Sequence, residues 1–210
     1  MPLGASRAPI MFLATFISEW LKYFFLLTPF FVLSVFLTYT AAVSRAQRRN
    51  LAIRVCVAVL IIVTAFLLFG GYMFQLFGIT LDAFRIGAGT LLFLSGISLA
   101  RETRQAPPNI EDLKTAAVVP LAIPVTVGPA TTGAILIMGA DMRAEGIHLP
   151  SLLGVLAAIL TLGLILYLSA HIEKLLGKLG ITILSRLTGL VLTALAAQIM
   201  FEGIRGLLAG

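Results

Sequence analysis

Six long apolar stretches separated by short polar segments dominate the chain. They fall at about 11–43, 51–77, 79–100, 115–140, 151–170 and 183–208. A helix needs roughly 20 apolar residues to cross a hydrocarbon core about 30 Å thick. The pattern therefore predicts an all-α polytopic membrane protein with six transmembrane helices. The first stretch is too long for one straight crossing, so we expect Glu19, Trp20, Lys22 and Tyr23 at the interface and residues 1–18 outside the span.

Composition supports a single membrane domain over residues 1–210, with the lipid bilayer as its solvent. The chain is 60% hydrophobic and 11% charged, whereas soluble domains average about 45–50% and about 25%. Arg7 precedes the first apolar stretch, as in a signal peptide. However, Glu19 and Lys22 interrupt that stretch and no small-residue cleavage site follows. We therefore interpret it as a membrane helix.

The net charge of +6 comes from bases in the loops, and we expect no nucleic-acid partner. Most of these bases follow the first, third or fifth stretch: Arg45, Arg48, Arg49, Arg54, Arg101, Arg104, Lys114, Lys174, Lys178 and Arg186. Loops rich in Lys and Arg stay in the cytoplasm. The charge pattern thus predicts a multi-pass protein of a bacterial inner membrane with both termini on the periplasmic side.

The two halves of the chain look related. A loop at 101–114 with Pro107-Pro108 separates a half at about 11–100 from one at about 115–208. Gly78-Ile79-Thr80 before the third stretch recurs as Gly180-Ile181-Thr182 before the sixth, and the first and fourth stretches both contain prolines. Repeats with an odd number of helices must be inverted in the membrane, which is a common construction in transporters. We predict two inverted three-helix repeats.

The fourth stretch contains the most informative pattern. Pro124, Gly128 and Pro129 make an unbroken helix improbable. Backbone groups freed by a break cannot face lipid, so this segment should line an enclosed or watery cavity. Gly128 as a cap and Pro129 at the first helical position would start a new half-helix, with the amides of residues 130–132 open to a carboxylate. Carbonyls of residues 123–127 would suit an ammonium group or a sodium ion. The alternative is a proline kink that only packs helices.

Thr28-Pro29 is the counterpart in the first stretch, followed by Ser34 one turn later. The alternative here is a simple kink whose Thr28 hydroxyl bonds its own backbone. We expect a break in both helices and a substrate site where they face each other. The predicted substrate-binding residues are Thr28, Pro29, Ser34, Pro124, Thr126, Gly128, Pro129, Ala130, Thr131 and Thr132.

The remaining polar residues suggest no second chemistry. Glu19 with Lys22, Asp82 with Arg85, and Glu202 with Arg205 have i,i+3 spacing and are expected to form local ion pairs near the outer helix ends. No carboxylate is predicted at mid-membrane, and coupling to sodium or protons is left open. Ser98 and His171 lack the pattern of a serine hydrolase, and Cys56 is the one cysteine. We expect no enzyme activity, no cofactor and no metal site.

Several of these segments resemble the MarC family of six-helix neutral amino-acid transporters. Its pattern has an FFxxxNPxGxxP-like first helix, bases after it, an FGI…AFRI start to the third helix and a PLAIP…GP string in the fourth. The matching residues are Phe24-Phe25, Pro29, Ser44, Arg48-Arg49, Phe77-Gly78-Ile79, Ala83-Phe84-Arg85-Ile86, Val119-Pro120-Leu121-Ala122-Ile123-Pro124 and Gly128-Pro129. In the first helix, Thr28, Phe31 and Ser34 replace the family's Asn, Gly and Pro.

The resemblance implies a secondary transporter of small neutral amino acids such as glycine or alanine, akin to compact exporters of the LysE type. A homo-oligomer is compatible with this expectation. The alternative is a non-transporting scaffold or regulator built on a transporter fold. A polar, solvent-reachable cavity at the crossing of the two broken helices would favour transport, and a dry packed seam would favour the alternative.

Overall fold

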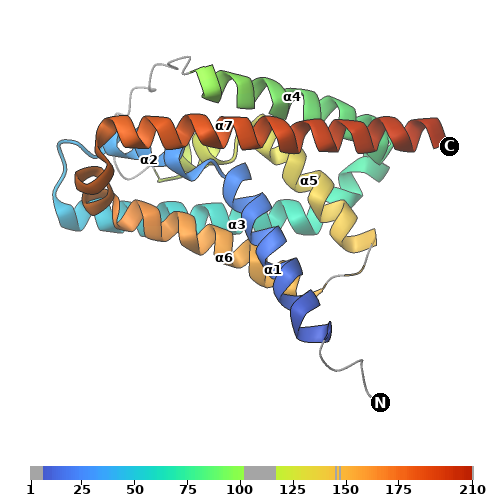
Figure 1. Cartoon of the computed structure of the whole chain (residues 1–210), viewed down its shortest axis with the longest axis horizontal. Coiled ribbons are helices and arrows are strands. Elements are labelled where there is room, and N and C mark those ends of the chain that lie inside the picture. Colours follow the sequence, from blue (N-terminus) through green and yellow to red (C-terminus); the bar gives the residue numbers. More distant parts are fainter. Residues whose placement is uncertain (1–6, 102–116, 145, 147, 210) are drawn as a thin grey trace.

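All regular structure in the described chain is helical. The computed structural model describes residues 7–101, 117–144, 146 and 148–209. The helices are α1 (Arg7–Leu26), α2 (Pro29–Tyr39), α3 (Arg45–Phe77), α4 (Leu81–Arg101), the π-helix η1 (Ala117–Thr126), α5 (Pro129–Ala144), α6 (Leu149–Tyr167) and α7 (Ser169–Ala209) (Figure 1). Most of the predicted linker lies outside the described residues.

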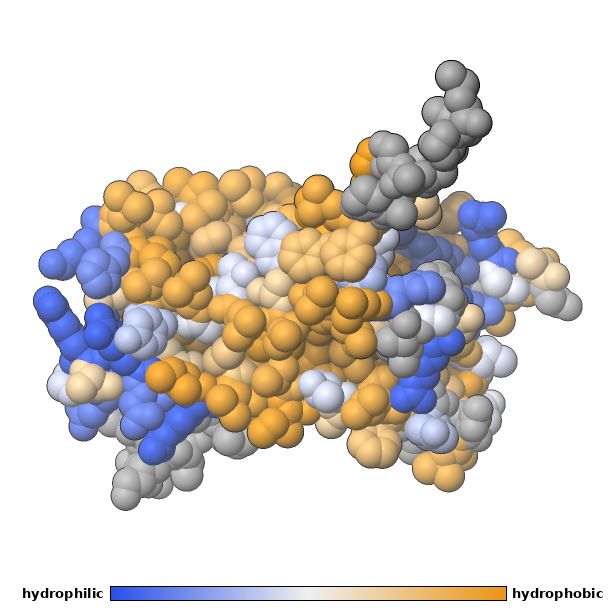
Figure 2. Space-filling model, turned by 90° about the horizontal axis from the view of Figure 1, so that it is seen from below, coloured by the Kyte–Doolittle hydropathy of each residue, from blue (hydrophilic) through white to orange (hydrophobic). Residues whose placement is uncertain are grey.

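The membrane character predicted from the sequence is confirmed. Helices α4, α6 and α7 and the Arg45–Phe69 part of α3 are long and apolar enough to cross a bilayer. Ile10–Leu26 and Pro29–Tyr39, bent by 42° at their junction, make a fifth candidate if the two together count as one span. Figure 2 shows an apolar band between two hydrophilic ends. The chain is therefore a polytopic helical membrane protein. The sixth span, formed by η1 with α5, stays a prediction.

Helices of the two halves pair in a matching way. α4 packs on α7, α1 on α6 and α3 on α5 and η1, while α2 contacts α7 and α4 contacts α5. Corresponding helices also run in opposite directions: α4 runs right to left in Figure 1, whereas α7 runs left to right alongside it. The contact of α1 with α6 thus matches that of η1 and α5 with α3, and the contact of α2 with α7 matches that of α5 with α4.

Glycines allow α4 and α7 to approach closely. A Cβ built on Gly189 would lie 2.6 Å from the Ala100 amide nitrogen and 2.7 Å from the Gly96 carbonyl oxygen. These are backbone atoms of the facing helix and cannot turn away. Small residues at such positions let membrane helices approach closely and gain van der Waals contact. This contact matters because the hydrophobic effect does not drive helices together inside a bilayer.

We expect the Gly189→Ala variant to lose roughly 1–3 kcal/mol of stability, because its methyl group would force the α4–α7 backbones apart. Thermal unfolding in detergent measures this loss. Gly87→Ala is the matched control, since a Cβ there meets nothing within 4 Å. Equal melting temperatures for the two variants would contradict the close packing.

One local expectation is corrected. Tyr23 does not sit at an exposed interface: it is 0% exposed, because α1 runs without interruption from Arg7 and packs this face into the molecule. Glycines with a positive φ stand before α4 and inside α7. Gly78 (φ 63°) precedes α4, and Gly177 (φ 65°) marks a kink in α7 three residues before Gly180. Both positions need a positive φ, which glycine adopts without a steric penalty.

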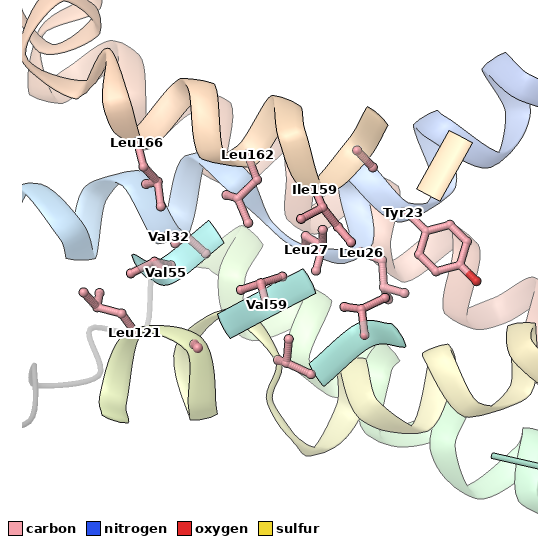
Figure 3. Packing of buried hydrophobic residues seen from close by; sticks show 14 of the residues in the cluster. Tyr23, Leu26, Leu27, Val32, Val55, Val59, Leu121, Ile159, Leu162 and Leu166 are labelled. Atoms are coloured by element: carbon pink, nitrogen blue, oxygen red, sulfur yellow. The ribbon is translucent and has the colours of Figure 1, made fainter. Parts of the chain in front are cut away.

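A buried apolar cluster joins the broken helices to α3 and α6. Figure 3 shows Leu26 and Leu27 at the end of α1, Val59 of α3 and Ile159 of α6 converging on it. Val127 and Ala130, on either side of the second break, belong to the same cluster. Both helix breaks therefore lie in the protein interior.

Candidate functional site

The first break is a left-handed turn at Thr28. α1 ends at Leu26 and α2 begins at Pro29, with Thr28 at φ 46° and ψ 54° between them. A threonine at positive φ is a genuine outlier, and such strain persists only where the surroundings enforce it. Thr28 is buried, its side chain makes no capping hydrogen bond, and its carbonyl oxygen accepts the Val32 amide at 3.0 Å. The predicted break in the first helix is thus present.

The second break follows a stretch of wide helical turns. η1 contains Pro120 and Pro124, which lack the amides that an α-helix would need. Its end shows the i→i−5 bonding of a π-helix: the Val127 amide donates to the Ala122 carbonyl oxygen at 2.8 Å. The segment was predicted to be unwound over 123–127, but the backbone is non-helical only at residues 127 and 128. Such π segments often occur at functional sites.

Helix α5 presents fewer open amides than predicted. The Thr132 amide donates to the Gly128 carbonyl oxygen at 2.8 Å, so it is not free for a ligand. Pro129 has no amide hydrogen. Ala130 and Thr131, in the first turn, retain N–H groups that have no acceptor within the helix. Both are 8% exposed, so these donors lie inside the protein.

The other predicted site residues divide into two groups. Thr126 is 1% exposed, and its hydroxyl donates to the Leu121 carbonyl oxygen at 2.7 Å, leaving its lone pairs as acceptors. Ser34 and Pro129 are exposed. None of the ten predicted site residues is among the described residues that line the cavity below. The side chain of Pro124 lies outside the described part of the structure. The helices at the two breaks are in contact, because η1, which precedes the second break, packs against α2, which follows the first.

A cavity of about 200 Å³ opens near the molecular end opposite the Arg45 loop. Helices α1, α5, α6 and α7 contribute most of its walls. Its polar and charged lining residues are Glu19, Lys22, Asp141, His148, Ser151, Gln198 and Glu202. Its apolar residues include Leu26, Leu92, Ala134 and Ile137, and each of these four is at most 4% exposed.

Ion pairs connect helices around this cavity. Lys22 Nζ lies 2.8 Å from Glu19 Oε1, which confirms the predicted local pair. Arg85 binds Asp82 at 2.6 Å, as predicted, and also binds Asp141 of α5. Glu202 instead accepts a hydrogen bond from Gln198 Nε2 at 3.0 Å. The Arg85–Asp141 contact joins residues 56 apart in sequence, so no local spacing could have indicated it.

The sequence therefore located the breaks but not the cavity. Its charged residues are spread over three helices and looked like unrelated interfacial pairs. The one usable signal was that Glu19, Asp82 and Glu202 all lie near helix ends on the same predicted side. Among the described residues, no group of three or more His, Cys, Asp or Glu side chains is placed to hold a metal ion.

The helical bundle, its broken helices and its partly buried ion pairs define a multi-pass integral membrane protein with a polar cavity. A model of the MarC family integral membrane proteins matches residues 13–208. The chain belongs to the MarC family.

Relatives span archaea and bacteria. A UPF0056 membrane protein of Methanocaldococcus jannaschii is 35% identical over 207 residues, covering 94% of this chain and 100% of its own length. The UPF0056 membrane protein YhcE of Escherichia coli is 28% identical over 200 residues, covering 89% of this chain and 90% of its own length. No solved structure matches the chain.

Proposed function

We propose that this protein is a secondary transporter of small neutral amino acids or similar small solutes. The observation that carries the proposal is that the inner end of the polar cavity lies close to both helix breaks. Leu26 on its wall is two residues before Thr28, and Ala134 is four residues after Ala130. One helical turn, about 6 Å of rise over four residues, thus separates the cavity from the open amides of α5.

The two breaks supply what a translocation site needs. The amides of Ala130 and Thr131 stand at the positive end of the α5 dipole and suit a carboxylate. Thr28 and Thr126 are buried nearby on the other two helix ends. In this structure the breaks are packed in apolar side chains, which is the dry seam expected above for the non-transporting alternative. The transport proposal therefore requires the broken helices to move and open this seam, with the short non-helical segments as hinges.

The paired contacts of the two halves support an inverted repeat. Matching helices run in opposite directions, and α2 and α5 each begin with a proline at the first helical position. Motion of one half against the other could then expose a central site alternately to the two sides. The cavity and the Arg45 loop lie at opposite ends of the molecule, as two entrances of such a path would (Figure 1).

Proteoliposomes loaded with purified protein test the proposal. We expect uptake or exchange of labelled glycine or alanine above the level of empty liposomes, and separate sodium and proton gradients would identify a coupling ion. Liposomes that show no flux for any small amino acid in any gradient would support a non-transporting scaffold instead.

We further propose that the protein lies in a bacterial inner membrane with the Arg45 loop in the cytoplasm. We expect Gln47→Cys to resist an impermeant thiol reagent added to intact cells and to react after lysis, because Gln47 is exposed on this basic end. A Cys56→Ala background removes the native thiol. Labelling of intact cells would reverse the assigned orientation.

A further inference from the structure

The polar cavity carries an excess of negative charge. Three carboxylates and one lysine line it, a formal charge of −2 with His148 neutral: Glu19, Asp141, Glu202 and Lys22. Arg85 lies beside it but is matched by Asp82, so the balance does not change. Glu19 and Asp141 are partly shielded from water, with side chains 16% and 31% exposed, whereas Glu202 is exposed at the rim. Charges interact more strongly at such shielded positions than in bulk water.

Two of the carboxylates retain capacity to bind a cation. The contacts described for Glu19 and Glu202 use a single oxygen each, Oε1 in both residues. A carboxylate offers about four acceptor positions, so neither residue is saturated by these bonds. A ligand that donates several N–H hydrogen bonds matches these carboxylate oxygens better than a ligand that can only accept hydrogen bonds.

A buried hydroxyl provides an independent indication of a ligand. Tyr23 is 0% exposed, and its hydroxyl has no hydrogen-bond partner within the described part of the chain. It follows Glu19 by one turn on the same face of α1, next to Lys22 of the cavity wall, although Tyr23 does not itself line the cavity. Figure 3 shows the hydroxyl directed away from Leu26 and Leu27. An orphaned buried hydroxyl is costly and requires a partner.

We propose that this cavity binds a primary ammonium group between the carboxylates of Glu19, Asp141 and Glu202, and that the Tyr23 hydroxyl, one turn beyond Glu19 on α1, supplies a further acceptor when the ligand is bound. The volume restricts the ligand to a small solute, because about 200 Å³ corresponds to roughly seven water molecules. This deepens the proposed transport function by naming the amine as the group that is recognised first. Binding at the cavity does not itself require transport.

The fluorescence of Trp20, the one tryptophan of the chain, reports binding because Trp20 follows Glu19 on α1. Purified protein in detergent is titrated with methylammonium chloride, sodium chloride and tetramethylammonium chloride at constant ionic strength. We expect saturation by methylammonium at concentrations at least about tenfold lower than for the other two salts, because only methylammonium donates N–H bonds to carboxylates. Equal responses to all three salts, or a response to sodium alone, would overturn the proposal.

Two variants test the assigned groups in opposite directions. Glu202→Gln should weaken methylammonium binding about tenfold, and Lys22→Gln should tighten it at least about threefold, since removing a positive charge favours a cation. A gain in affinity cannot arise from misfolding. Glu173→Gln, at the far end on α7, is the control and should leave binding unchanged. Unaltered affinity in both cavity variants would refute the site.

The result is separable from the transport assay. Selective methylammonium binding without amino-acid flux would keep this cavity as an ammonium site and reject the transport function. Amino-acid flux that is unaffected by methylammonium and by Glu202→Gln would keep transport and reject this site.

Discussion

The Gly128→Leu variant should transport at least about tenfold more slowly than the wild type, which corresponds to roughly 1.4 kcal/mol of lost interaction. Gly128 lies between η1 and α5, and its carbonyl oxygen caps the Thr132 amide. A leucine side chain there would obstruct approach to the amides of Ala130 and Thr131 in the first turn of α5. Initial rates in proteoliposomes, at equal amounts of inserted protein, measure the effect.

Gly87→Leu controls for the added side chain. Gly87 is exposed on α4, and a Cβ there meets nothing within 4 Å. We expect this variant to insert, melt and transport like the wild type. A Gly128→Leu protein that folds and carries a carboxylate-bearing solute at the wild-type rate would place the substrate site elsewhere.

The Arg85→Gln variant should be less stable than the wild type by about 1–3 kcal/mol. Arg85 holds Asp82 of its own helix and Asp141 of α5, and its side chain is 18% exposed. Removing the cation leaves two carboxylates near one another with no shared partner. Breaking a fully buried pair costs about 3–5 kcal/mol and an exposed pair about 0–1 kcal/mol, so partial burial gives an intermediate value.

Thermal unfolding in detergent measures this difference, with Arg205→Gln as the control. Arg205 is an exposed arginine of α7 near the same molecular end, so the control removes the same charge without breaking the bridge between α4 and α5. Arg85→Lys should retain part of the stability, because one ammonium group cannot reproduce the forked contact of a guanidinium with two carboxylates. Equal melting temperatures for Arg85→Gln and Arg205→Gln would show that the bridge adds nothing.

Amino-acid order alone determined the membrane class, the approximate helix limits and the two breaks. Apolar stretches of spanning length dictate helices, because lipid cannot satisfy backbone polar groups. Pro29 and Pro129 dictate where helices restart, because proline lacks the amide hydrogen and fixes φ at a value suited to the first turn. These are local constraints, so they can be recognised without knowing what packs against what.

Tertiary structure alone decided which polar groups meet. Asp141 joins Arg85 across α4 and α5, and Glu19 faces a cavity shared with Glu202 of α7, although nothing in their spacing links these residues. The capping of Thr132 by Gly128 and the burial of Tyr23 likewise depend on the fold. The physical reason is that helix periodicity specifies which face a side chain occupies on its own helix, whereas the neighbour across that face depends on how all the helices pack together.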